Sequence, residues 1–221
     1  MTGATPAGRV IALDNDIVLK ASCYQSSSLL WRDVGPADSI GVLGAARFVV
    51  SKLIPRMELT ASLDDILAEL ARILGRASVL EPTDDEAAFA AEIEVRASQN
   101  GQQLDSGESQ LAAMVVLRSL DLLQTGDKRG IRALEVLLDA VAEMAPLSGR
   151  VMCLEQLVRR AVEQGSMTEL RPSVCRERAV DTAMTMCFAC HTPDLSADDV
   201  LSGLTSYIED LRRHAPRVLV E

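Results

Sequence analysis

Short apolar runs alternate with amphipathic segments along the first two thirds of the chain. Runs rich in Val, Ile, Ala and Leu predict strands over residues 9–13, 40–44, 77–80 and 120–125. Apolar residues at helical spacing predict helices over residues 17–21, 29–31, 45–54, 63–74, 83–98, 106–118 and 129–144. This alternation of strands and helices predicts an α/β fold with a small, mostly parallel sheet.

The pattern changes after about residue 146. Helices are expected near residues 150–164, 174–189 and 196–214, and no strand is expected before residues 218–220. We therefore expect an α/β domain over residues 1–146 and an α-helical C-terminal region over residues 147–221.

Composition indicates a folded protein with an acidic surface. Apolar residues make up 48% of the chain and charged residues 24%, an ordinary globular mixture. The formal net charge is -10, and residues 58–112 alone carry twelve acids against three bases. An acidic protein gains little non-specific attraction to nucleic acid, which normally requires a basic face, and this argues against a role in coating nucleic acid. An enzyme whose acids bind cations stays compatible with it.

The cellular location of the protein is predicted from targeting and membrane-spanning segments, neither of which is visible in the sequence. No basic and apolar leader and no long apolar stretch is visible, so we expect a cytoplasmic protein that makes no contact with a membrane. The five cysteines are odd in number and irregularly spaced, and they are expected to be reduced thiols.

Carboxylates follow the expected strands or begin the expected helices. Asp14 and Asp16 follow the first strand, and Asp127 follows the strand that ends at position 125. Asp105 and Glu108 lie three positions apart at a helix start and face the same side. Because the carboxyl ends of parallel strands share one edge, all five can meet there and bind Mg²⁺ or Mn²⁺. Each acid taken singly is also an ordinary cap or solvated loop residue.

The order of these segments resembles that of PIN-domain nucleases, which include toxin-like ribonucleases. The resemblance covers about residues 9–145 and rests on Asp14-Asn15-Asp16, Leu104-Asp105-Ser106-Gly107-Glu108 and Leu122-Leu123-Gln124-Thr125-Gly126-Asp127-Lys128-Arg129. It implies a three-layer α/β/α fold and Mg²⁺- or Mn²⁺-dependent endonuclease chemistry, usually on RNA. It also implies metal ligands at Asp14, at Asp105 or Glu108, and at Asp127, with Asp16 as an outer or second ligand. Possible partners under this resemblance are a second copy of the chain and a protein regulator or antitoxin.

One feature departs from the family pattern. Many of these nucleases carry a Glu in the helix after the second strand, and the stretch from Val42 to Arg47 has none. Either Glu108 takes over that role or the site is degraded. If Glu108 takes over the role, the chain is expected to be a metal-dependent endoribonuclease, with DNA as the other possible substrate. If the site is degraded, the chain is expected to be an inactive PIN-like binding or regulatory module.

Four bases near the acids are candidates for contacts with a phosphate backbone. They are Lys20, Lys128, Arg129 and Arg132. The alternative interpretation is that they are solvated helix residues.

The segment Cys187-Phe188-Ala189-Cys190-His191 matches the pattern for covalent haem attachment. Together with Cys175 it also offers four possible zinc ligands. A single CxxC pair is weak evidence for zinc, and free cysteines are usually buried, so packing in the core is the favoured interpretation. A zinc, haem or redox protein acting through Cys187, Cys190 and His191 is the third alternative.

Overall fold

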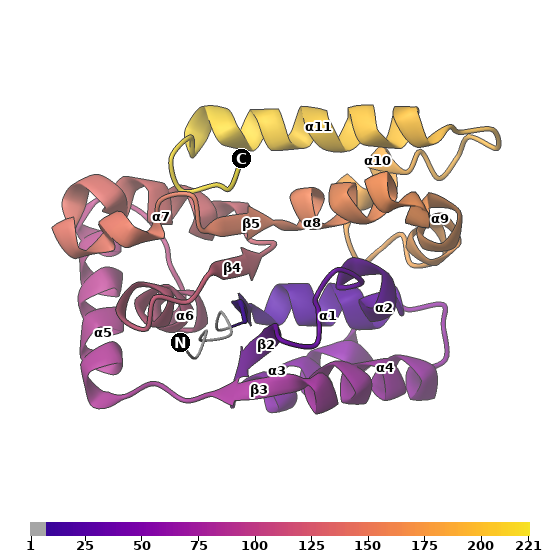
Figure 1. Ribbon diagram of the computed structural model, residues 1–221. Coiled ribbons are helices and arrows are strands. Elements are labelled where there is room, and N and C mark those ends of the chain that lie inside the picture. Colours follow the sequence, from indigo (N-terminus) through magenta and orange to yellow (C-terminus); the bar gives the residue numbers. More distant parts are fainter. Residues whose placement is uncertain (1–7) are drawn as a thin grey trace, which may run out of the picture.

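The computed structural model describes residues 8–221 and contains a five-stranded, all-parallel sheet with helices on both faces (Figure 1). The strand order is β3-β2-β1-β4-β5. The strands are β1 (Val10–Leu13), β2 (Ser39–Leu43), β3 (Ala77–Leu80), β4 (Leu122–Thr125) and β5 (Val151–Cys153). The chain therefore builds one half of the sheet outward from β1, then returns to the centre to add β4 and β5. The expected α/β/α architecture is confirmed.

Alternating side chains of the strands enter two separate cores. Ile11 and Leu13 lie in one core, whereas Ala12 between them lies in the other. The first core is covered by α1 (Asn15–Cys23), α2 (Ser27–Leu30), α3 (Ala46–Leu53), α4 (Leu63–Arg76) and α8 (Leu154–Ala161). The second is covered by α5 (Asp84–Gln99), α6 (Ser106–Leu117) and α7 (Lys128–Ala140). Apart from the edge strand β3, whose Ser78 and Val79 are exposed, the strands are buried on both faces, which explains why their sequences are largely apolar and do not alternate with polar residues.

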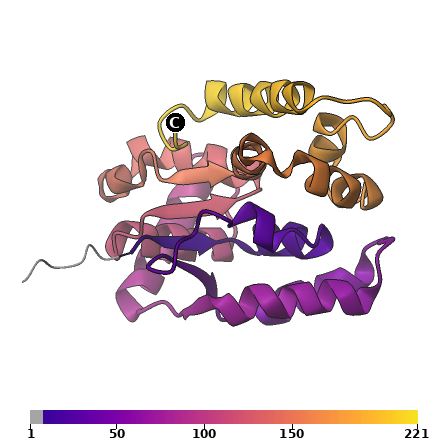
Figure 2. The same cartoon turned by 45° about the vertical axis from the view of Figure 1, so that its right-hand side comes forward.

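The remaining elements belong mostly to the C-terminal region. They are α9 (Met167–Arg176), α10 (Thr182–Cys187), α11 (Ala197–His214), the 3₁₀ turns Ile54–Arg56 and Ala142–Leu147, and a π-helical turn at Val162–Ser166. Helix α11 lies along the top of both views, on the side of the molecule far from α4 (Figures 1 and 2). No helix among residues 8–221 combines the length and the apolar character needed to cross a membrane.

The C-terminal region differs from its expected form in two places. Residues expected to begin a helix at 150 form strand β5, which pairs with β4 through Leu123 and Val151. The helix expected over residues 174–189 is two helices, because α9 ends at Arg176 and α10 begins only at Thr182. Three apolar residues are too few to show a strand period, so β5 has no signal of its own in the sequence. The sheet therefore continues past the boundary expected at residue 146.

The end of the chain is bound to this added strand. Leu219 forms an isolated parallel bridge with Val151, where a strand was expected over residues 218–220. The Glu135 carboxylate of α7, which is buried, accepts hydrogen bonds from the backbone N–H groups of Arg217 (3.0 Å) and Val218 (2.9 Å). The Arg217 guanidinium adds a charged contact of 2.6 Å to the same carboxylate. One buried acid thus fixes the C-terminal segment on the sheet.

Replacing Arg217 with Met should destabilise the fold. The change leaves the buried Glu135 carboxylate without its counter-ion, which we expect to lower the free energy of unfolding by about 1–3 kcal/mol. Urea unfolding of both proteins measures this. The matched control is Arg213→Met, because the Arg213–Asp210 pair is exposed on both sides, and its loss should cost less than about 1 kcal/mol. Equal effects of the two substitutions would contradict the role given to Glu135.

Candidate active site

Three helices begin with an aspartate at the carboxyl edge of the sheet. Asp14, Asp105 and Asp127 are the N-cap residues of α1, α6 and α7. Together with Asp16 and Glu108 they line one cavity of about 470 Å³. We call this cavity the acid pocket. All five acids that the sequence identified as candidates therefore line the same cavity.

The turn between β4 and α7 explains why Thr125, Gly126 and Asp127 stand in this order. The Thr125 hydroxyl donates to Asp14 Oδ2 over 3.0 Å. A Cβ on Gly126 would lie 2.0 Å from Asp16 Oδ2, so any larger residue would require that carboxylate to move. Asp127 then caps α7 by accepting from the backbone N–H groups of Arg129 and Gly130. Each residue of the turn thus serves a different acid of the pocket.

Asp14 is the most deeply buried aspartate of the pocket. Its Oδ1 accepts from the Asn15 backbone N–H over 2.7 Å, and its exposed fraction is 7%. Burial raises its pKa to about 6, more than the hydrogen bonds from Asn15 and Thr125 lower it.

Asp105 and Glu108 form a reciprocal capping box at the start of α6. The Glu108 N–H donates to Asp105 Oδ1 (2.9 Å), and the Asp105 N–H donates to Glu108 Oε2 (3.2 Å). Glu108 Oε1 is buried and has no hydrogen-bond partner within residues 8–221. Burial, with the nearby charges of Asp105, Asp14 and Asp127, raises the Glu108 pKa to about 8. At neutral pH this carboxyl group is therefore protonated unless a cation approaches it.

Two acids of the pocket are neutralised by neighbouring bases. Burial alone would raise the pKa of Asp127, but hydrogen bonds from Arg129 outweigh it and lower that pKa. Asp16 Oδ2 lies 2.8 Å from Lys20 Nζ, one helical turn further along α1. Burial still raises the Asp16 pKa, because the attraction of Lys20 is smaller than the loss of hydration.

The donor chemistry of the pocket fits a hard divalent cation. All five groups are carboxylates, the ligand type of Mg²⁺ and Mn²⁺, and Glu108 Oε1 is a buried oxygen that finds no partner in the described part of the chain. In their present positions, however, no three acidic, cysteine or histidine side chains of residues 8–221 stand close enough to enclose an ion. Binding would require the carboxylates to exchange hydrogen bonds and ion pairs that they now make within the protein.

The four candidate bases differ in how firmly they are held. Lys20 also contacts Asp181 Oδ2 over 2.7 Å. Lys128 binds Glu155 over 2.7 Å and lies 4.8 Å from the centre of the Tyr207 ring. Arg129 pairs with Asp127 but is 76% exposed, and Arg132 is half-buried. Of the four, Arg129 is the base most free to turn toward a bound polyanion.

Two functional neighbours of the pocket carry no signal in the sequence. Asp181 and Glu155 come from the C-terminal region and hold Lys20 and Lys128. Sequence spacing cannot reveal such contacts, because each partner lies far away along the chain. Helix α3 also lines the pocket, through Val49 and Leu53. No acid comes from that helix, as its sequence indicated.

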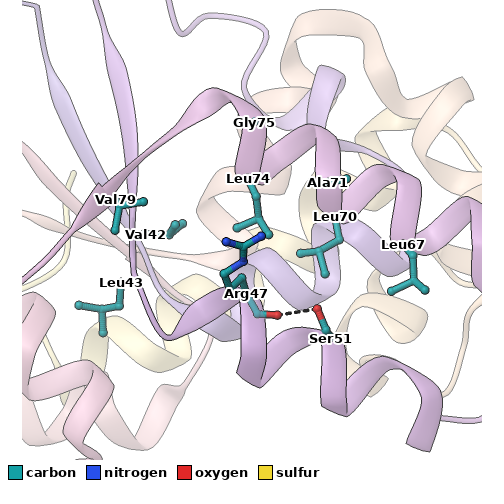
Figure 3. A pocket seen from close by; sticks show the side chains of 11 residues that line it. Val42, Leu43, Arg47, Ser51, Leu67, Leu70, Ala71, Leu74, Gly75 and Val79 are labelled. Atoms are coloured by element: carbon teal, nitrogen blue, oxygen red, sulfur yellow. Dashed lines mark hydrogen bonds between the residues drawn. The ribbon is translucent and has the colours of Figure 1, made fainter.

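A larger cavity, of about 560 Å³, lies between β2, α3 and α4 (Figure 3). Leu67, Leu70 and Leu74 of α4 contribute to its mostly apolar lining, and Arg47 is the one charged residue that lines it within residues 8–221. A single guanidinium among leucines provides no acid–base pair and no metal-ligand set. The smaller acid pocket is therefore the better candidate for chemistry.

Two cysteines contradict the expectation of reduced thiols. Cys175 and Cys190 form a disulfide, whereas Cys23, Cys153 and Cys187 are free and buried. The bond takes Cys190 out of any zinc or haem site with Cys187 and His191. Burial also raises the pKa of Cys187 to about 12, so this thiol stays protonated. The disulfide removes the cysteine argument for a cytoplasmic location.

No family model, curated protein or solved structure matches this chain.

Glu108 should make the stability of the metal-free protein depend on pH. The folded protein holds the Glu108 proton more tightly than the unfolded chain, because the pKa of this group rises from about 4.5 to about 8 on folding. The resulting contribution to the free energy of unfolding is fully present below about pH 4.5 and is lost as pH rises through about 8. We expect Glu108→Gln, which preserves the capping box, to match the parent at pH 5 and to exceed it by roughly 1–3 kcal/mol at pH 8. Urea unfolding at the two pH values measures the difference. Glu92→Gln on α5 is the control, and an identical pH dependence of Glu108→Gln and the parent would refute the assignment.

Reduction of Cys175–Cys190 should also lower stability. The bond closes a loop with a sequence separation of 15, and opening such a loop costs about 3 kcal/mol of unfolding free energy. The measurement is urea unfolding with and without a dithiol reductant. The double variant Cys175→Ser/Cys190→Ser should have the unfolding free energy of the reduced parent, and the reductant should not change it. A parent that shows five free thiols before reduction would contradict the bond.

Proposed function

We propose that this protein is a divalent-metal-dependent endonuclease acting on RNA. The observation that supports it best is the meeting of five carboxylates, from the starts of three helices, in one cavity at the carboxyl edge of a parallel sheet. Sites in such sheets form at this edge. An acid-lined pocket repels a polyanionic substrate unless cations are bound in it, so the proposal requires a metal.

The residues divide into metal ligands and groups that support them. Asp14, Asp127 and either Asp105 or Glu108 would hold Mg²⁺ or Mn²⁺, with Asp16 as a second or outer ligand. When bound, such an ion neutralises charge on a phosphoryl oxygen and activates a water for in-line attack. Thr125 orients Asp14 through its hydroxyl, and the N-termini of α1, α6 and α7 stabilise the carboxylates near them.

The substrate would be held by a few local bases. Arg129 is exposed and can exchange Asp127 for a phosphate, whereas Lys20 and Lys128 are held by acids of the C-terminal region. Arg132 follows on the same helix, α7. With so few free bases, we expect weak binding that depends on the metal and on salt. DNA is the alternative substrate. We also propose that the protein is cytoplasmic. Its proposed protein partners are a second copy of the chain and a regulator or antitoxin.

The second candidate is an inactive PIN-like module that binds or regulates. It is favoured by the apolar residues that α3 presents to the pocket and by the present separation of the acids. Such a module would bind Mn²⁺ or RNA without cleaving the RNA.

Cleavage of labelled single-stranded RNA and DNA with Mn²⁺, Mg²⁺ or a chelator tests the proposal. We expect cleavage of RNA with either metal and none with the chelator. Asp14→Asn and Asp127→Asn should each reduce the rate at least about 100-fold, because each removes a charge that holds the metal. Asp65→Asn, at an exposed acid of α4, should cleave as the parent does. Activity that survives in both site variants would show a contaminant or a wrong site, and metal or RNA binding without cleavage would favour the inactive module.

A further inference from the structure

Lys20 stands between two carboxylates that come from opposite ends of the chain. Its ammonium lies 2.8 Å from Asp16 Oδ2 and 2.7 Å from Asp181 Oδ2. The Lys20 and Asp181 side chains are only 12% and 13% exposed, so water screens this contact poorly. Asp16 belongs to the acid pocket, whereas Asp181 lies just before α10. The ammonium therefore has a second anchor outside the set of acids proposed to bind metal.

Asp181 is held in place without help from Lys20. It is the N-cap of α10 and accepts from the Met184 backbone N–H over 2.9 Å. It lies in the loop that the Cys175–Cys190 disulfide closes. In the same loop, the buried Glu177 carboxylate accepts from the backbone N–H groups of Thr60 (2.8 Å) and Ala61 (2.7 Å). A carboxylate fixed in this way can keep an ammonium in position after its other partner leaves.

We propose that Lys20 is a built-in counter-ion of the acid pocket that competes with a divalent cation for Asp16, and that Asp181 is the positioning residue that retains Lys20 when Asp16 turns to the metal. In the metal-free protein, Lys20 neutralises Asp16. When a cation takes Asp16, the ammonium keeps one full ion pair and does not have to cross into the pocket beside the metal. The inference rests on the proposed function for the presence of that metal.

The two residues should therefore have opposite effects on metal affinity. Removing Lys20 removes the competitor and one positive charge, so the metal binds more tightly. Removing the charge of Asp181 leaves Asp16 as the one short ion-pair partner of Lys20 among residues 8–221, so the metal binds more weakly. If the Lys20–Asp181 pair only held the C-terminal region against α1, both substitutions would disturb the pocket in the same way. Both would then change the metal affinity in the same direction.

The test is a titration of the full chain with Mn²⁺. Binding is monitored by calorimetry and by the electron paramagnetic resonance signal of free Mn²⁺. Lys20→Met should tighten Mn²⁺ binding by about three- to tenfold, and Asp181→Asn should weaken it by a similar factor. Asparagine still caps α10, so this change removes the charge and keeps the helix start. In the Lys20→Met background, Asp181→Asn should change the affinity by less than about twofold, because its effect passes through Lys20.

Two further variants serve as controls. Arg129→Met also removes one positive charge next to the pocket, but Arg129 is 76% exposed and its effect should be smaller than that of Lys20→Met. Asp194→Asn removes an exposed acid of the C-terminal region and should leave the affinity within about twofold. Circular dichroism and urea unfolding establish that each variant is folded before its affinity is compared.

Three results would overturn the inference. If Lys20→Met and Asp181→Asn both weaken Mn²⁺ binding, or both leave it unchanged, Lys20 does not compete with the metal. If Asp181→Asn weakens binding equally with and without Lys20, Asp181 acts through its own charge and not by positioning. If neither the parent nor Lys20→Met binds Mn²⁺, the proposed function loses its metal, and the inference falls with it. In the first two cases the parent still binds Mn²⁺, so the proposed function survives.

Discussion

The crowding of like charges at one edge of the sheet is the constraint on which the rest of the structure depends. Asp14, Asp105 and Asp127 stand together because parallel strands return through helices that all begin at that edge. The positive ends of the helix dipoles, with the capping hydrogen bonds, make each aspartate acceptable there. They do not remove the mutual repulsion, which contributes to the raised pKa values of Asp14 and Glu108.

Further from the edge, charge balance is restored by the C-terminal region. Lys20 and Lys128 lie beside the acid pocket, and both are held by acids from beyond the sheet's fourth strand. Without Asp181 and Glu155, two ammonium groups would be free to move over the acids. The C-terminal region therefore takes part in the electrostatics of the pocket, while its strand β5 takes part in the sheet.

Local patterns in the sequence predicted the features that local physics produces. Four strands, the helix starts at Asp14 and Asp105, and the missing acid on α3 could be deduced from neighbouring residues. Strand β5 could not, because three apolar residues owe their extended form to pairing with β4. The Cys175–Cys190 bond and the Lys20–Asp181 pair join residues with no spacing that marks them as partners. The acids were thus predictable one by one, and the counter-ions that make their burial possible were not.

The binding of the chain end to Glu135 bears on how this architecture divides. A cut after residue 146 would take one strand of five from the sheet and leave the Glu135 carboxylate without the backbone and guanidinium donors that now surround it. The same cut would separate Lys20 from Asp181 and Lys128 from Glu155. The boundary expected from the change in the strand and helix pattern therefore does not separate two independent structural units. Recombination, insertion or domain exchange at that point would leave two parts, each lacking contacts that the other supplies.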